Sequence, residues 1–186
     1  DVENYIIFHP SAQYNYKVYP KYLRNKLLEN LASLGIPILI TGGNNKIDLK
    51  IKAEIPVASN IYNLIGQTSL EEYFVLSQLS LAYIGMDTLN MHIAASHNKP
   101  IFTIFGPTKI SMWSPWSNNL QKAAENNSPI QEYGDITIFQ SSFPCNVCGL
   151  IGCGSIHGRS EFNYSVKPED IFVKVKKWYK KYSIEL

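Results

Sequence analysis

Residues 81–108 read LAYIGMDTLNMHIAASHNKPIFTIFGPT, and this stretch decides the fold. It holds two apolar runs of strand length, 81–84 and 100–105, and each of them ends at a glycine. Between them, the small residues Ala94, Ala95 and Ser96 indicate a thin helix over 88–96 that lies close to a sheet. A strand, a helix and a second strand in this order predict two parallel strands of one sheet joined by a crossover helix.

The same alternation extends from this stretch to the amino terminus. Buried strands are expected at 5–9, 36–41 and 61–65, because each apolar run there stops at a proline or a glycine. Helices are expected at 21–34, 46–54 and 70–79, the last one after a cap at Thr68-Ser69. Five alternations of strand and helix predict an α/β fold, a Rossmann-like parallel sheet with helices on both faces.

Beyond the fifth strand the pattern becomes less regular. We expect an irregular, cysteine-containing insertion at about 114–165, with a short strand at 136–139. A helix over 168–182 should close the chain, since apolar residues recur on one of its faces: Ile171, Val175, Trp178 and Tyr182. The 186 residues are therefore interpreted as a single domain, 1–186.

Composition excludes several classes of function. The net charge is +2, from 17 basic and 15 acidic residues, which is too small to make nucleic acid the main partner. No apolar run approaches the roughly 20 residues that cross a bilayer, and no secretory signal opens the chain. Three cysteines within nine residues are not a disulfide framework, so a cytoplasmic location is expected. Without an initiator Met, the chain is interpreted as a domain of a longer protein.

Polar and small residues gather where the predicted strands end. They are Ser11, Gly42 and Gly43, Asp87 and Thr88, and the segment 106–108. In an open parallel sheet, ligands bind beyond the carboxyl ends of the strands, so these residues should share one rim. Hydroxyls, glycines and a helix amino terminus on one rim suit a ligand that carries phosphate. The alternative is that each residue simply allows the chain to turn.

The start of the 88–96 helix holds the most informative side chains. His92 lies four residues beyond Thr88 on the same helix face, where it would donate to a diphosphate or a sugar hydroxyl. A phosphate would repel Asp87, so Asp87 is expected either to cap the helix or to accept from a sugar or ribose hydroxyl. The alternative is a plain N-cap at Asp87 and a hydrogen-bonded interior residue at His92.

Several motifs together resemble one known family. The segment MDTLNMHIAA at 86–95, KPIFTIFGPT at 99–108 and Trp113-Ser114-Pro115 resemble the donor-site signature of family-nine glycosyltransferases, which include the lipopolysaccharide heptosyltransferases. His9-Pro10-Ser11-Ala12 with Lys17, the strand end at 39–43 and NLIGQTSL at 63–70 resemble other motifs of that family, in the same order. The resemblance runs from about residue 5 to 180.

The resemblance implies the GT-B fold, in which two Rossmann-like domains face each other across a cleft. This chain would be the C-terminal domain, which binds the nucleotide-sugar donor. The N-terminal acceptor domain, which carries the general base in this family, would be absent. The chain would then contain no catalytic residue of its own and would bind donor without turning it over.

The resemblance also implies roles for single residues. Lys17 would contact the donor phosphates, Thr88 and His92 the diphosphate, and Asp87 the transferred sugar. Leu64 would lie against the base, near Gly42-Gly43. No cofactor is required, the favoured donor is of the ADP-heptose type, and the acceptor is a glycan of the lipopolysaccharide core. The sequence departs from the family pattern at Leu89, where the pattern has glycine; a side chain there would crowd the diphosphate or shift the helix start.

Two other functions and one membrane contact stay open at this point. Cys145, Cys148, Cys153 and His157 have the spacing of a zinc site, which would make the chain a zinc-stabilised interaction module; the alternative is three reduced thiols. A sugar-nucleotide epimerase of similar architecture is the other candidate. The lysine-rich helix at 168–182 presents either a solvated face or a peripheral contact with acidic lipids of the inner membrane.

Overall fold

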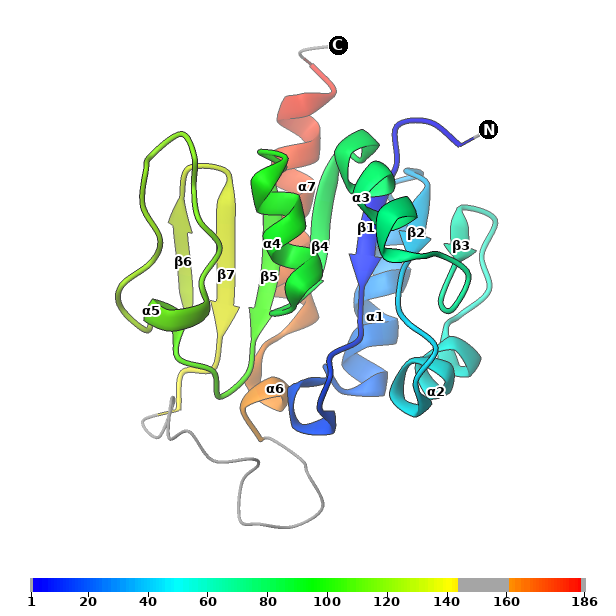
Figure 1. Cartoon of the computed structure of the whole chain (residues 1–186), viewed down its shortest axis with the longest axis horizontal. Coiled ribbons are helices and arrows are strands. Elements are labelled where there is room, and N and C mark those ends of the chain that lie inside the picture. The colour runs from blue at the N-terminus through cyan, green and yellow to red at the C-terminus, as the bar shows by residue number, and fades with distance from the viewer. Residues whose placement is uncertain (1, 144–160, 185–186) are drawn as a thin grey trace.

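The computed structural model describes residues 2–143 and 161–184 and is built on one seven-stranded sheet (Figure 1). The strand order is β3-β2-β1-β4-β5-β7-β6. The strands are β1 (Ile6–His9), β2 (Ile38–Ile40), β3 (Ile61–Asn63), β4 (Ala82–Met86), β5 (Ile101–Phe105), β6 (Ile130–Tyr133) and β7 (Ile136–Gln140). Every neighbouring pair is parallel except β6 with β7. The predicted α/β, Rossmann-like fold is confirmed.

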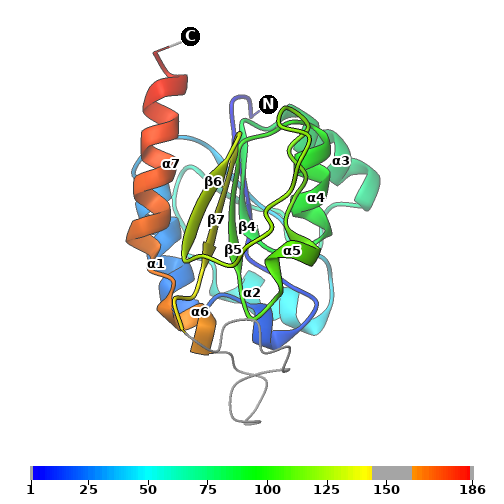
Figure 2. The same cartoon turned by 90° about the vertical axis from the view of Figure 1, so that its left-hand side faces the viewer.

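Helices cover both faces of the sheet. They are α1 (Lys21–Ala32), α2 (Lys46–Glu54), α3 (Leu70–Leu79), α4 (Leu89–Ser96), α5 (Ile110–Trp113), α6 (Glu161–Ser165) and α7 (Pro168–Tyr182), with a 3-10 turn, η1, at Asn15–Lys17. Figure 2 shows α1 and α7 on one side of the sheet and α3 and α4 on the other. Because strand side chains alternate between faces, Ile6 and Phe8 join the core under α1 and α7, whereas Ile7 joins the core under α4.

Local chemistry explains why the helix predictions agree with the structure. The bounds expected for α2 and α7 are those observed. At α3, the Ser69 hydroxyl accepts from the Glu72 amide and the Glu72 carboxylate accepts from the Ser69 amide, a complete capping box. Helix α1 ends at Ala32, two residues before the predicted end, and the chain then turns through Gly35 at φ +75°.

Within the insertion expected at 114–165, the short strand predicted at 136–139 is confirmed as β7, whereas β6 was not expected. Strands β6 and β7 form a hairpin there, and β7 pairs with β5 over five residues, so the insertion widens the sheet. The turn consists of Gly134 and Asp135, with Gly134 at φ +55°. A two-residue Gly-Asp loop between two segments of strand length is a hairpin signal in the sequence. The three shortest helical elements, η1, α5 and α6, show too little of a helical period to be predicted.

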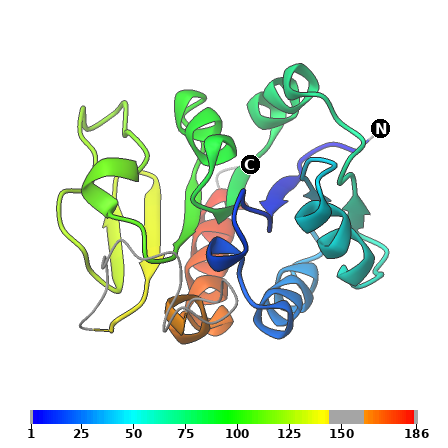
Figure 3. The same ribbon diagram turned by 60° about the horizontal axis from the view of Figure 1, so that its bottom comes forward.

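The strand order also fixes where a ligand site can form. From β1 the chain proceeds outward to β2 and β3, and from β4 it proceeds the other way to β5, so the order reverses between β1 and β4. Loops that leave such neighbouring strands in opposite directions open a crevice at the carboxyl edge of the sheet. Figure 3 turns this edge towards the viewer. Within the described residues, the structure contains no helix that is both long and apolar enough to cross a bilayer.

Candidate functional site

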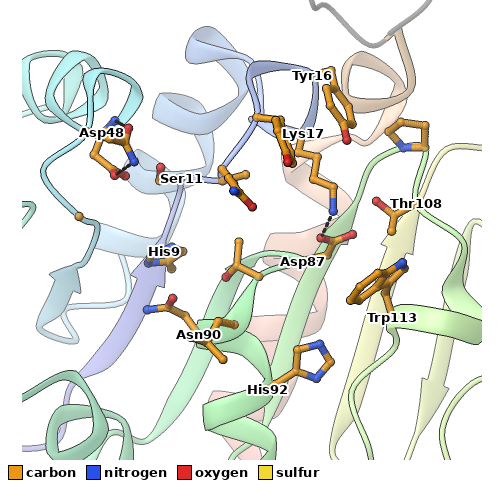
Figure 4. Close-up of a pocket in the computed structure, with 18 of the residues that line it drawn as sticks. His9, Ser11, Tyr16, Lys17, Asp48, Asp87, Asn90, His92, Thr108 and Trp113 are labelled. Carbon is orange, nitrogen blue, oxygen red and sulfur yellow. Dashed lines mark hydrogen bonds and ion pairs between the residues drawn. The ribbon is translucent and has the colours of Figure 1, made fainter. Parts of the chain in front are cut away.

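A cavity of about 910 Å³ opens at this reversal of strand order (Figure 4). Four segments line it: 9–17 from the end of β1, 43–48 after β2, 87–92 from the end of β4 into the first turn of α4, and 107–113 after β5. The cavity therefore lies at the carboxyl edge of the sheet, where the sequence predicted a rim of polar and small residues. Its size is that of a typical site for a small molecule or cofactor.

Most of the predicted donor-site residues meet in this cavity. Ser11, Lys17, Gly43, Asp87, Thr88 and His92 all line it. Two residues do not. A Cβ on Gly42 would come within 3.0 Å of the Asp48 carboxylate and 3.2 Å of Ile65, so Gly42 packs behind the lining. Leu64 is partly buried against the hydrophobic core on the α4 side.

A buried ion pair forms the centre of the cavity wall. The Lys17 ammonium is 2.8 Å from Oδ1 of Asp87, a side chain that is only 5% exposed. The second carboxylate oxygen, Oδ2, is buried and has no hydrogen-bond partner among the described residues. Burial raises the pKa of Asp87, and the nearby charge of Lys17 acts in the opposite direction. Asp87 thus presents an unused acceptor beside the cavity.

Asp87 is not a helix cap, which corrects one of the two roles expected for it. The N-cap of α4 is Thr88, and Thr88 makes no side-chain capping bond. The first-turn N–H groups of α4 therefore lie at the cavity without a capping side chain, and they carry the positive end of the helix dipole. An anion at this position would be stabilised by both effects.

His92 lies one turn into α4 and faces the cavity (Figure 4). It is half-buried, so the structure does not support the alternative of an interior histidine. Desolvation lowers the pKa of His92. The nearby Asp87 carboxylate raises this pKa, but by a smaller amount than desolvation lowers it. A neutral imidazole here retains one N–H to donate towards a ligand.

Sequence reasoning missed several residues of the lining. Asp48 comes from the first turn of α2, and Tyr16 from η1. Trp113, on α5, belongs to the motif that resembles the family's donor-site signature, and it also lines the cavity. Thr108, from the predicted rim segment 106–108, lies on the same wall as Asp87 (Figure 4), and its hydroxyl contributes to lowering the pKa of Asp87. Asp48 had a usable signal, because an acid in the first turn of a helix that follows the β2 end must lie near the same rim.

The candidate zinc ligands remain a prediction. Cys145, Cys148, Cys153 and His157 lie outside the described residues. Within residues 2–143 and 161–184, no group of three His, Cys, Asp or Glu side chains could hold a metal ion.

His9 forms the buried base of the cavity and should make folding sensitive to acid. Its ring nitrogen Nδ1 is 3.0 Å from the Thr41 hydroxyl, and burial lowers the pKa of His9 from 6.5 to about 4. Between those two values the unfolded chain binds a proton at this residue and the folded chain does not, so stability falls as the pH falls. We expect this residue to account for about 2 kcal/mol of lost stability between pH 7 and pH 5.

Urea unfolding of the wild type and His9→Gln at both pH values measures this effect. Gln keeps a polar group near Thr41 but does not titrate, so the difference in stability between pH 7 and pH 5 should shrink by about 2 kcal/mol in the variant. An equal pH dependence in the two proteins would show that His9 is protonated in the folded state.

Comparisons with known proteins agree with this geometry. The sequence model of glycosyltransferase family 9 (heptosyltransferase) matches residues 1–140. Lipopolysaccharide heptosyltransferase 3 of Escherichia coli is 30% identical over 121 residues, which are 63% of this chain and 36% of that protein. Lipooligosaccharide heptosyltransferase 2 of Haemophilus ducreyi is 34% identical over 117 residues, 59% of this chain and 34% of that protein.

A solved structure extends the similarity in fold beyond the matched segment. The E. coli ADP-heptose lipopolysaccharide heptosyltransferase II superposes with a TM-score of 0.71 at 19% identity, covering 97% of this chain and 48% of that one. The matched segments cover about a third of the length of these curated relatives. The family match covers well over half of the chain, and the chain therefore belongs to glycosyltransferase family 9, the heptosyltransferase family.

Proposed function

We propose that this chain is the donor-binding domain of a heptosyltransferase and that it binds a nucleoside-diphosphate sugar of the ADP-heptose type. The observation that carries the proposal is the convergence of Lys17, the amino end of α4 and His92 on one cavity at the reversal of strand order. All three favour negative charge or donate hydrogen bonds, as a diphosphate requires. The names of the relatives, lipopolysaccharide heptosyltransferases and an enzyme named for ADP-heptose, support this choice of donor.

The proposed chemistry is displacement at the anomeric carbon of the donor. An acceptor hydroxyl forms the new C–O bond and loses its proton to a base, while the bond from the anomeric carbon to the diphosphate oxygen breaks. Negative charge grows on the leaving diphosphate. Lys17, His92 and the first-turn amides of α4 would stabilise that charge without a metal ion. Oδ2 of Asp87 would accept from a hydroxyl of the transferred sugar.

The remaining steps require a second domain. Because the match covers only about a third of the relative's length, we propose that an N-terminal acceptor domain of the GT-B kind completes the cleft and supplies the base. The acceptor would be a glycan of the lipopolysaccharide core, handled at the cytoplasmic face of the inner membrane. The 186-residue chain by itself would then bind donor without transferring the sugar.

Thermal unfolding with a panel of nucleotides tests the donor proposal. We would compare ADP-heptose and ADP with GDP, UDP and dTDP and their sugars, since a ligand at 100 times its Kd adds about 2.7 kcal/mol of stability. A shift confined to the adenine nucleotides supports the proposal. A shift with another base reassigns the donor, and no shift with any nucleotide contradicts the proposal for this chain.

Leu89 gives a second prediction for the same site. Helix α4 begins at Leu89, and this residue lines the cavity with 59% of its surface exposed. Replacing Leu89 with glycine should remove a bulky group beside the first-turn amides and tighten ADP binding about fivefold, at a cost of about 1 kcal/mol in stability. Isothermal titration measures the affinity. Weaker binding by the variant would show that Leu89 contacts the nucleotide favourably.

A further inference from the structure

Two loops of the cavity are held by a residue far away in the sequence. Asn163, on α6, is 1% exposed and lies outside the cavity lining. Its side-chain amide donates to the Tyr16 carbonyl at 2.9 Å and to the Val18 carbonyl at 3.2 Å. These two carbonyls flank Lys17, the cation of the ion pair. Both amide protons of Asn163 are therefore used to hold the backbone on either side of Lys17.

Apart from the ion pair of Lys17 with Asp87, few contacts fix the three residues of η1. This segment is a 3-10 turn of three residues with no buried side chain, closed by two short-range backbone bonds. Such a turn has weak hydrogen-bond geometry and too few contacts to hold itself in place. A second connection to the α6 region runs from the Tyr19 hydroxyl to the Val166 carbonyl at 2.6 Å. The segment 16–19 is thus tied to 163–166 across 147 residues of sequence.

The same amide lies beside the loop that follows β5. A Cβ on Gly106 would come within 3.1 Å of Oδ1 of Asn163, so the β5 loop passes directly against it. Another buried amide, that of Gln140, donates to the carbonyls of Gly106 and Thr108 at 3.4 and 3.0 Å. The C-terminal part of the chain therefore fixes the backbone of two cavity walls.

We propose that Asn163 is a positioning residue for donor binding, acting through Lys17. With its amide in place, the Lys17 ammonium is held over the cavity at the height of Asp87 and the α4 amino end, ready for the diphosphate. Without the Asn163 amide, the Tyr16 and Val18 carbonyls lose a hydrogen-bond donor and the 3-10 turn becomes less ordered. Ligand binding must then also order Lys17, and this cost in free energy weakens the binding. This role rests on the proposed donor site.

A double-mutant cycle distinguishes positioning from simple stabilisation of the fold. In Asn163→Ala, we expect the Kd for ADP to rise about 10-fold, while the Kd for adenosine, which has no phosphate, changes less than about twofold. In a Lys17→Ala background, the same substitution should change the Kd for ADP less than about twofold, because its effect passes through Lys17. Equal weakening of ADP and adenosine, or a full effect in the Lys17→Ala background, would overturn the proposal.

Asn60 provides a matched control. Its amide also donates to two backbone carbonyls, those of Ala32 and Ile36 at 3.0 and 2.9 Å, but it lies at the opposite end of the sheet from the cavity. Asn60→Ala should lower stability without changing the affinity for ADP. If Asn163→Ala does not fold, Tyr19→Phe removes the other tie with hardly any change of shape, and it should weaken ADP binding about threefold but not adenosine binding.

The chemical reactivity of Lys17 can be measured without a ligand, so it tests the role of Asn163 independently of donor binding. Acetylation rates of the lysines, measured by mass spectrometry, report how firmly Lys17 is held in its ion pair. We expect Lys17 to react about fivefold faster in Asn163→Ala and at an unchanged rate in Asn60→Ala. If the wild type binds no ADP, the proposed donor site fails, yet this rate still decides whether Asn163 positions Lys17. An unchanged rate in Asn163→Ala would refute the positioning role.

Discussion

Replacing Lys17 with alanine is expected to weaken the binding of ADP by about 100-fold, the free energy of one charge-assisted contact to phosphate. Lys17 faces the cavity from η1 with its side chain 21% exposed, so water only partly screens its charge. Isothermal titration of the wild type and the variant measures the change. A second consequence is a buried Asp87 carboxylate without its cation, which should lower stability by about 1–2 kcal/mol at neutral pH.

That loss of stability should itself depend on pH. Burial already raises the pKa of Asp87, and removal of Lys17 removes the main influence that lowers it. An acid with a raised pKa in the folded state destabilises the fold above that pKa and is relieved as the pH falls. The variant should therefore recover stability relative to the wild type on acidification. Adding Asp87→Asn should remove most of the defect at neutral pH.

Lys109 offers the control for charge alone. It lines the same cavity from the β5 loop but is exposed and forms no ion pair within the described part of the chain. Lys109→Ala should change the affinity for ADP less than about fivefold and leave stability unchanged within about 0.5 kcal/mol. Equal losses of affinity in the two variants would mean that general positive charge, rather than the placed Lys17, attracts the nucleotide.

The sequence was sufficient for features that depend on local patterns. Strand β5 follows from an apolar run that ends at a glycine, and the cap at Ser69 follows from a Ser and a Glu three residues apart. The position of the rim follows from the same logic, because parallel strands place all their carboxyl ends at one edge. This is why six of the eight expected donor-site residues line one cavity.

The features that could not be predicted depend on contacts between distant segments. The ion pair joins Lys17 to Asp87 across 70 residues, and the Asn163 amide reaches Tyr16 across 147. No periodicity or spacing within a segment encodes such pairings. Leu64 was expected only from the family resemblance, to lie against the base; in the structure it is partly buried against the core and does not line the cavity, so its contact with a base stays a prediction.

Gly85, where an added Cβ has no room, leads to the prediction with the largest effect on stability. Gly85 lies in β4 and pairs with His9 of β1. A Cβ added to Gly85 would lie 2.4 Å from the His9 carbonyl oxygen and 2.9 Å from the Tyr83 hydroxyl. The first of these is backbone in a neighbouring strand, which cannot move without breaking the β1–β4 pairing on which the cavity is built. We expect Gly85→Ala to lower the free energy of unfolding by about 3 kcal/mol.

Gly35→Ala separates this steric overlap from the general effect of replacing glycine. Gly35 adopts φ +75° but a Cβ there meets nothing within 4 Å, so the cost should be the left-handed backbone alone, about 1 kcal/mol. Urea unfolding of both variants gives the comparison. Because β1 carries the loop with Ser11 and Lys17 and β4 leads to Asp87, forcing these strands apart should also weaken ADP binding in Gly85→Ala but not in Gly35→Ala. A cost at Gly85 no larger than that at Gly35 would show that the two strands have room to separate, and the cavity would then not depend on their close approach.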